Sequence, residues 1–175
     1  MGIIAIIITV IISLLIVRAL YKFYKDIKKD DIDLNNSSIS QKFNIIVENL
    51  NNWCFENKGT YIKVDKRTLK IYDGVSNQIV YLTYSTGILN IVWKYKYYQQ
   101  EMVYENNVQN ARNLTEMEQE TISMNLINDF NNKLEEHKRK VNQSGKINQV
   151  VDDVLSKQGI SKENILKARN FLNKD

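Results

Sequence analysis

The feature that most constrains this chain is an uncharged, apolar run at residues 2–17, which Arg18 follows directly. A bilayer core of about 30 Å requires roughly 20 helical residues, and the mostly apolar residues 19–24 bring the segment to that length. We therefore predict a transmembrane anchor with an interfacial flank at residues 1–24, in which residues 2–20 contact the lipid bilayer. The residues assigned to the anchor and its boundary are Gly2, Ile3, Val17, Arg18, Tyr21 and Lys22.

A secretory signal peptide is the main alternative for this segment. Such a peptide has a basic stretch before its apolar core and small residues at its cleavage site. No Lys or Arg precedes the run, and the sequence Arg-Ala-Leu-Tyr after it makes a poor cleavage site, so an uncleaved signal anchor is the better interpretation. The aromatic and basic flank also argues against a buried helix of a soluble protein. Thr9 and Ser13 share one helix face, either as a helix-packing surface or, more simply, bonded to their own backbone.

The basic residues near the anchor predict its orientation. Lys and Arg residues follow the run at positions 18, 22, 25, 28 and 29, and none precedes it. The positive-inside tendency therefore puts the C-terminal body in the cytoplasm, on a single-pass protein of the cell (inner) membrane. The lack of proline and the abundance of Asn, Ile and Lys fit an AT-rich genome, bacterial or viral.

Overall composition narrows the function classes. The formal net charge is +4. Most nucleic-acid-binding domains have a larger excess of positive charge, so a nucleic-acid partner is not expected. The single cysteine, Cys54, excludes an internal disulfide and lies on an apolar helix face, where it would pack as a small hydrophobic residue. The roughly 150 residues after the anchor suffice for one domain with its own core.

The next segments are predicted to be a polar linker and a helix. Residues 25–38 show no apolar period, so we expect the anchor helix to fray into a polar linker there. A helix is predicted over residues 39–58, because Ser38 and Gln41 fit a capping box and apolar residues recur at helical spacing. Gly59 would provide its C-terminal stop. The expected apolar face comprises Phe43, Ile46, Val47, Leu50, Trp53 and Cys54.

Between residues 60 and 105 the apolar period changes from helical to alternating, which is typical of strands. Short connections allow only neighbouring strands to pair, in antiparallel fashion, so a meander of four or five strands is expected. The expected strands are Thr60–Val64, Thr68–Asp73, Gln78–Tyr84, Ile88–Tyr98 and a possible last strand, Glu101–Glu105.

A long helix is predicted over residues 114–141, with Thr115 and Glu118 as its capping box. It would complete an α+β domain at residues 39–143. Residues 144–175 are expected to form a helical hairpin that is too small to be very stable alone and that packs on the domain or on another copy. Within it Gly159, Ile160, Ser161 and Glu163 resemble the short C-terminal oligomerisation hairpins of bacterial membrane-linked proteins, a resemblance that covers under a fifth of the chain.

No residue pattern indicates a catalytic, cofactor-binding or metal-binding site, and we assign no residues or cofactors to one. His137 is the only histidine and has no Cys or His partner at ligand spacing; it is expected to pack partly on its helix. The sequences Asp30-Asp31-x-Asp33 and Asp152-Asp153 lack the glycine and the spaced oxygen ligands of a calcium loop, and are expected to be solvated.

The strongest local signal is the aromatic and basic stretch at residues 91–98. Alternation puts its Trp and Tyr side chains on one strand face and its lysines on the other. Such a surface can bind nucleic acid by stacking bases, but the simpler interpretation is aromatic side chains packed under helices, with lysines in water. The outer tyrosines could form a protein-binding rim. The possible partner-surface residues are Trp93, Tyr95, Tyr97, Phe171 and Leu172.

These features favour a non-enzymatic role in tethering or assembly. A single anchor would present a small cytoplasmic α+β interaction or scaffold domain, and confinement to the membrane would raise its effective concentration for a membrane-bound partner. A protein partner, or self-association, is expected through the C-terminal helices. Two alternatives remain. One is a ligand-binding or enzymatic domain with a polar cleft between sheet and helix, using His137 or Glu101. The other is a viral membrane or virion component.

Overall fold

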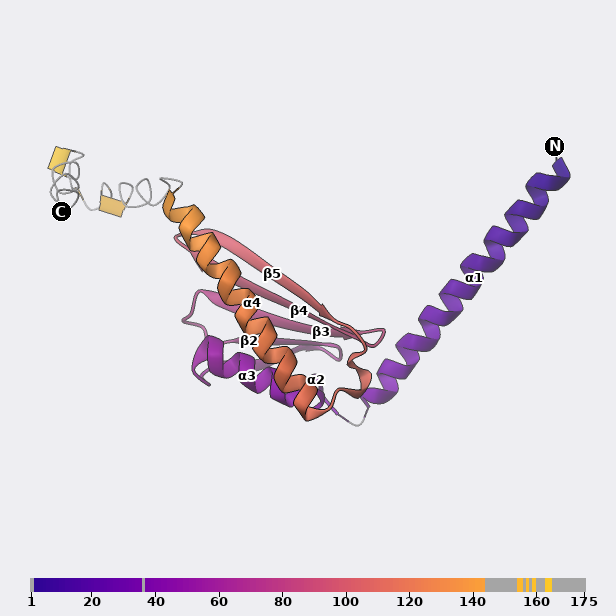
Figure 1. The fold of residues 1–175 in the computed structure, drawn as a ribbon, viewed down its shortest axis with the longest axis horizontal. Coiled ribbons are helices and arrows are strands. Elements are labelled where there is room, and N and C mark those ends of the chain that lie inside the picture. The colour runs from indigo at the N-terminus through magenta and orange to yellow at the C-terminus, as the bar shows by residue number, and fades with distance from the viewer. Residues whose placement is uncertain are drawn as a thin grey trace.

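The computed structural model describes residues 2–35 and 37–143, together with residues 154–155, 157, 159 and 163–164. Its fold is α+β, as predicted: a long N-terminal helix projects from a body in which helices cover a five-stranded sheet (Figure 1). The elements are α1 (Gly2–Asp33), α2 (Ile39–Lys42), α3 (Asn44–Phe55), β1 (Thr60–Asp65), β2 (Thr68–Tyr72), β3 (Gln78–Ser85), β4 (Ile88–Tyr97), β5 (Gln100–Val108), the 3-10 helix η1 (Ala111–Asn113) and α4 (Glu116–Gln143). The hairpin expected at residues 144–175 lies almost wholly outside the described residues.

The sheet is an antiparallel meander with the strand order β1-β2-β3-β4-β5, which confirms the prediction and its fifth strand. Because each strand reverses the last, the β1–β2 and β3–β4 turns meet at one end of the body. The β2–β3 and β4–β5 connections lie at the opposite end. The order also leaves β1 and β5 as the two edges of the sheet.

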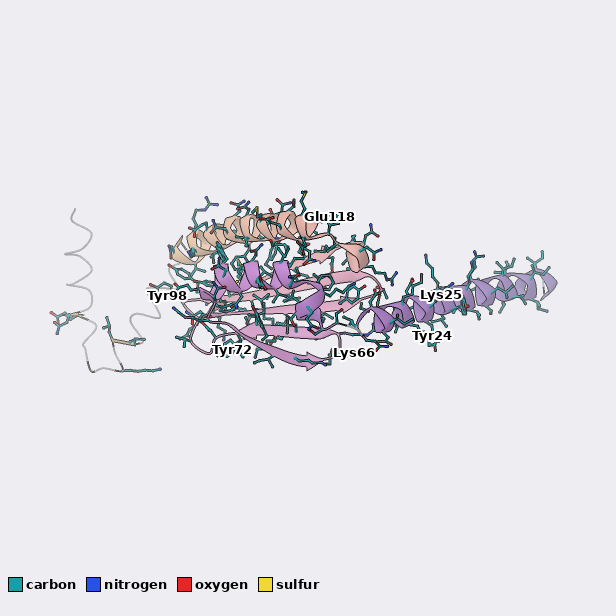
Figure 2. All side chains as sticks on the ribbon, turned by 90° about the horizontal axis from the view of Figure 1, so that it is seen from below. Tyr24, Lys25, Lys66, Tyr72, Tyr98 and Glu118 are labelled. Atoms are coloured by element: carbon teal, nitrogen blue, oxygen red, sulfur yellow. The ribbon has the colours of Figure 1, made fainter. Side chains whose placement is uncertain are left out.

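Alternation along the strands builds the core on one face of the sheet, which α3 and α4 cover (Figure 2). Trp93 of β4 is fully buried, and Phe130 of α4 stacks on it with ring centroids 3.5 Å apart and an interplanar angle of 4°. On this side the sheet and α3 also bury Leu50, Ile71 and Leu82 completely. The aromatic side of the stretch 91–98 therefore faces the helices, as the simpler interpretation held.

The helix predicted over residues 39–58 is interrupted and ends early. The capping box is confirmed, since the Ser38 amide donates to Gln41 Oε1 at 2.9 Å and the Gln41 amide donates to Ser38 Oγ at 3.3 Å. The chain breaks at Phe43 into α2 and α3, and left-handed Glu56, with φ 51°, ends α3. The prediction that Gly59 stops the helix was therefore wrong.

Gly59 serves a packing role instead. Its amide donates to Asn51 Oδ1 at 2.9 Å, and a Cβ atom at Gly59 would lie 2.3 Å from that same oxygen. Only a residue without a side chain lets the backbone approach α3 this closely. Trp53, expected to be buried, is 41% exposed and contacts the rings of Trp93 and Phe130 edge-on.

The predicted capping box of the long helix is confirmed. The Thr115 amide donates to Glu118 Oε2 at 2.8 Å, and the Glu118 amide donates to Thr115 Oγ1 at 3.3 Å. From there α4 runs along the sheet towards the β4–β5 turn, with Phe130 and Leu134 buried.

The first part of α1 is long and apolar enough to cross a membrane. Its most apolar window has a mean hydropathy of 2.6, and none of that window is buried against the body. Thr9 Oγ1 donates to the Ala5 carbonyl at 2.9 Å, and Ser13 Oγ donates to the Thr9 carbonyl at 2.8 Å. Both hydroxyls are therefore bonded to their own helix, which is the simpler of the two interpretations given above.

The polar linker expected at residues 25–38 differs from the structure. The helix continues unbroken to Asp33, and Asp30, expected to be solvated, is wholly buried. The physical reason is that this part of α1 packs on the body through charged side chains. A search for an apolar period cannot detect such a face.

Candidate functional site at the junction of α1 and the body

The last turns of α1 carry an acidic stripe. Asp26, Asp30 and Asp33 follow one another at spacings of four and three residues, which places them on one helix face. That face meets the body where the β1–β2 turn, the β3–β4 turn and η1 come together. Lys66 of the β1–β2 turn marks this end of the body, beside the foot of α1 (Figure 2).

Asp30 is the centre of the junction. Its Oδ1 atom accepts three hydrogen bonds: from Arg112 Nη2 at 2.8 Å, from Arg112 Nε at 3.2 Å and from the Gly87 amide at 3.1 Å. Its Oδ2 atom accepts none from the described residues, and Arg67 Nη1 lies 3.8 Å away. One buried carboxylate thus connects α1 to η1 and to the β1–β2 and β3–β4 turns.

Each of the two arginines also donates a hydrogen bond to a backbone carbonyl of α1. Arg112 donates to the Asp26 carbonyl at 3.2 Å, and Arg67 donates to the Ile27 carbonyl at 2.9 Å and to Asp31 Oδ1 at 2.8 Å. A guanidinium suits this task because its planar fork donates in several directions at once. The arginines therefore bind both the side chains and the backbone of α1.

Gly87 allows Arg112 to lie over the β3–β4 turn. Its φ of +74° is unfavourable for residues with a side chain, and a Cβ atom there would lie 3.2 Å from Arg112 Cζ. The glycine therefore serves both the turn and the close approach of the arginine.

A second group of contacts extends the junction into the core. Asp33 Oδ2 accepts a hydrogen bond from the buried Tyr84 hydroxyl at 3.0 Å and lies 3.9 Å from Lys42 Nζ. Lys42 in turn donates to the Arg112 carbonyl at 2.7 Å. The acidic end of α1 is thus joined to α2, β3 and η1 as well as to the turns.

The electrostatics follow from these contacts. The hydrogen bond with Asp30 raises the pKa of Arg112, and the hydrogen bond with Arg67 lowers the pKa of Asp31. Burial, together with the hydrogen bond to Asp33, raises the pKa of Tyr84. The charged forms of Asp31 and Arg112 are therefore favoured at neutral pH, with Tyr84 as a neutral donor.

Chemically, the arrangement is suited to holding two parts of the molecule in fixed geometry. Buried ion pairs add little net stability over an apolar contact, but removing one partner leaves an uncompensated charge and costs about 3–5 kcal/mol. The cluster therefore disfavours arrangements of α1 that separate Asp30 from Arg112. Each aspartate in it lies within ion-pair or hydrogen-bond distance of a cation or a hydroxyl.

The predicted anchor residues all lie in α1. Val17 and Tyr21 are 62% and 67% exposed, and Arg18, Lys22 and Gly2 are exposed as well. Ile3 belongs to the same helix. The structure thus separates α1 into an apolar part without contacts to the body and an acidic part that packs on it.

Three of the predicted partner-surface residues, Trp93, Tyr95 and Tyr97, lie on β4. Trp93 is fully buried in the core, so truncating it would test packing and not partner contact. Tyr95 is partly buried against the core and contacts Phe130, and Tyr97 packs edge-on against Tyr98 at the β4–β5 turn. Phe171 and Leu172 lie outside the described residues.

The residues considered for chemistry lie apart. His137 Nε2 is 3.4 Å from the Gln100 carbonyl oxygen, and Glu101 pairs with Lys94 at 3.7 Å on the other face of the sheet. Asp152 and Asp153 fall outside the described part of the chain. Within that part, no group of three or more His, Cys, Asp or Glu side chains is arranged to hold a metal ion.

The junction residues were missed by the sequence reasoning. A signal was present, because Asp26, Asp30 and Asp33 share a helix face and arginine is scarce in this lysine-rich chain. What the sequence lacked was any indication that Arg67 and Arg112, far along the chain, would meet that face.

Comparison with models of protein families, with curated proteins and with solved structures gave no match, so the molecule's own geometry is the basis for any assignment of function.

Proposed function

We propose that this chain is a single-pass, membrane-anchored protein that presents its α+β body as an interaction or scaffold domain in the cytoplasm, in a non-enzymatic tethering or assembly role. The observation that carries the proposal is the division of α1. Its apolar part makes no contact with the body, whereas its acidic part is fixed to the body through Asp30.

This division supports presentation at a set distance from the membrane. The helix from Tyr21 to Asp30 spans about 14 Å at about 1.5 Å per residue. If Tyr21 lies at the headgroups, the body begins directly beneath the bilayer surface. An interaction domain held in that layer meets membrane-bound partners at a raised effective concentration.

Membrane anchoring is tested by extraction. The full-length chain, expressed in bacterial cells, should stay in the membrane pellet after washing with alkaline carbonate and dissolve in detergent. A variant without residues 2–20 should be soluble, because the rest of α1 is polar and packs on the body. Recovery of the full-length chain in the carbonate supernatant would contradict the anchor.

Orientation is tested by protease access. A protease added outside intact spheroplasts should leave the body uncut, and permeabilising the membrane should expose it. Digestion of the body in intact spheroplasts would reverse the proposed topology while leaving the anchor itself in place.

A further inference from the structure

An unpaired sheet edge lies within the body. Among the described residues β1 forms a ladder with β2 alone, so its other side presents backbone donors and acceptors that no described strand pairs with. All six residues of β1 are exposed, including Tyr61 at 43%, Ile62 at 41% and Val64 at 56%. Such an edge is suited to binding a further strand.

The middle of the edge carries a positive charge. Lys63 lies there, and no ion pair to it is present among the described residues; Asp65, at the end of β1, accepts a hydrogen bond from the Arg67 amide at 2.6 Å. A lysine on an edge strand opposes indiscriminate pairing. The same charge favours a strand that places a carboxylate opposite it.

A cavity opens beside Lys63 on the helix-covered side of the edge. Its volume is about 250 Å³, below the roughly 300–1,000 Å³ of ordinary ligand sites, and it therefore suits a single side chain. Leu34, Ile39 and Leu69 give it buried apolar walls, and its charged lining residues are two lysines and one aspartate: Lys63, Lys66 and Asp65. Leu69 is also the register partner of Lys63, so cavity and charge share one face of the sheet.

We propose that β1 binds an extended segment of a partner protein as a sixth strand, with a glutamate of that segment opposite Lys63. The aliphatic stem of a glutamate fits the apolar walls, and its carboxylate reaches the ammonium group at the rim. This inference rests on the proposed role as an interaction domain and names the surface and the class of partner that it uses.

The test uses the full-length chain in detergent micelles. The probe is a capped, fluorescent peptide about nine residues long, an ordinary strand length, made of alternating Thr and Val with one central Glu. Anisotropy should show saturable binding, and hydrogen exchange should show new protection at residues 60–65. The same peptide with alternate backbone amides methylated should not bind, because it cannot complete the ladder.

Charge reversal makes the test specific. Lys63→Glu should weaken binding of the Glu peptide roughly tenfold, and a peptide with Lys in place of Glu should restore it. Arg139→Glu, an equal charge change at an exposed site on α4, should leave binding unchanged.

Three outcomes would overturn the inference. The first is equal binding of the Glu peptide by Lys63→Glu and by the unaltered chain, and the second is that Arg139→Glu weakens this binding as much as Lys63→Glu does. The third is hydrogen-exchange protection of β1 by self-association without peptide, which would make a second copy the occupant. Each is distinguishable from failure of the proposed function, because carbonate extraction and protease access do not depend on β1.

Discussion

At the scale of single residues, Asp30 decides how the two parts of the molecule are joined. It is the only acidic side chain among the described residues that is wholly buried, and it is compensated by Arg112 at 2.8 Å. A buried charge with its partner in place is tolerated, whereas either group alone is expensive. The junction therefore depends on Asp30 far more than on the exposed Asp31 beside it.

Replacing Asp30 with Asn should destabilise the body by about 3 kcal/mol, because Arg112 loses its buried counter-ion. Urea unfolding followed by Trp fluorescence measures the change. Asp31→Asn, at a side chain that is 43% exposed, should cost much less, because solvent screens an exposed ion pair. Equal effects of the two substitutions would show that burial does not set the importance of Asp30.

Lowering the pH should weaken the junction by protonating Asp31. Its ordinary pKa of 3.8 is lowered in the folded chain, chiefly by the hydrogen bond with Arg67. The unfolded chain therefore binds this proton more readily than the folded chain. The stabilisation is present above about pH 4 and is lost as the pH falls through the lowered folded pKa. Urea unfolding across acidic pH should show a weaker dependence in Asp31→Asn than in the unaltered chain.

At the scale of elements, the body is held together by α3 and α4 packed on one face of the sheet. Phe130 is the centre of that contact, because it stacks on Trp93 and meets Trp53 and Tyr104 edge-on. The helices and the sheet thus share one aromatic cluster, drawn from elements far apart in the sequence.

Phe130→Ala should lower the free energy of unfolding by about 3–5 kcal/mol, the usual cost of emptying a buried aromatic site. It should also change Trp emission in the folded state, since both tryptophans contact this ring. Met124→Ala on the same helix, at a side chain that is 54% exposed, should stay within about 0.5 kcal/mol. A small effect of Phe130→Ala would mean that α4 is held by other contacts.

At the scale of the whole molecule, α1 is an unbroken helical connection between the apolar segment and the body, and we expect it to be stiff. The helix runs from the apolar segment to Asp33 without a break, and its foot is fixed by contacts to the turns, η1 and the core. Tilting of the apolar part should therefore move the body with it. A helix that frayed into a polar linker at residues 25–38, as the sequence predicts, would have coupled the two less directly.

Spin labels can measure this stiffness. Labels at Tyr24→Cys and Tyr98→Cys, at opposite ends of the described body and its junction (Figure 2), should give one narrow distance distribution. Cys54 should react slowly, because burial raises the pKa of its thiol. Asp30→Asn should broaden the distribution, whereas an unchanged width would show that the ion cluster does not fix α1.

Local patterns in the sequence were enough to predict most of the fold. The capping boxes at Ser38 and Thr115, the alternating strands and the apolar start of α1 each depend on residues close in sequence. Local pattern was insufficient at Gly59, where Asn51 sets the role of the glycine, and at residues 25–33, where the buried helix face is charged.

The sequence by itself therefore determined most of the elements, the meander and the segment able to enter a membrane, because hydrophobic period and capping act over a few residues. Only the tertiary structure decided that Asp30 is buried and that a cavity lies beside the edge strand β1. These properties arise from contacts between residues such as Asp30 and Arg112. Because the two lie far apart along the chain, no local sequence pattern indicates that they are in contact.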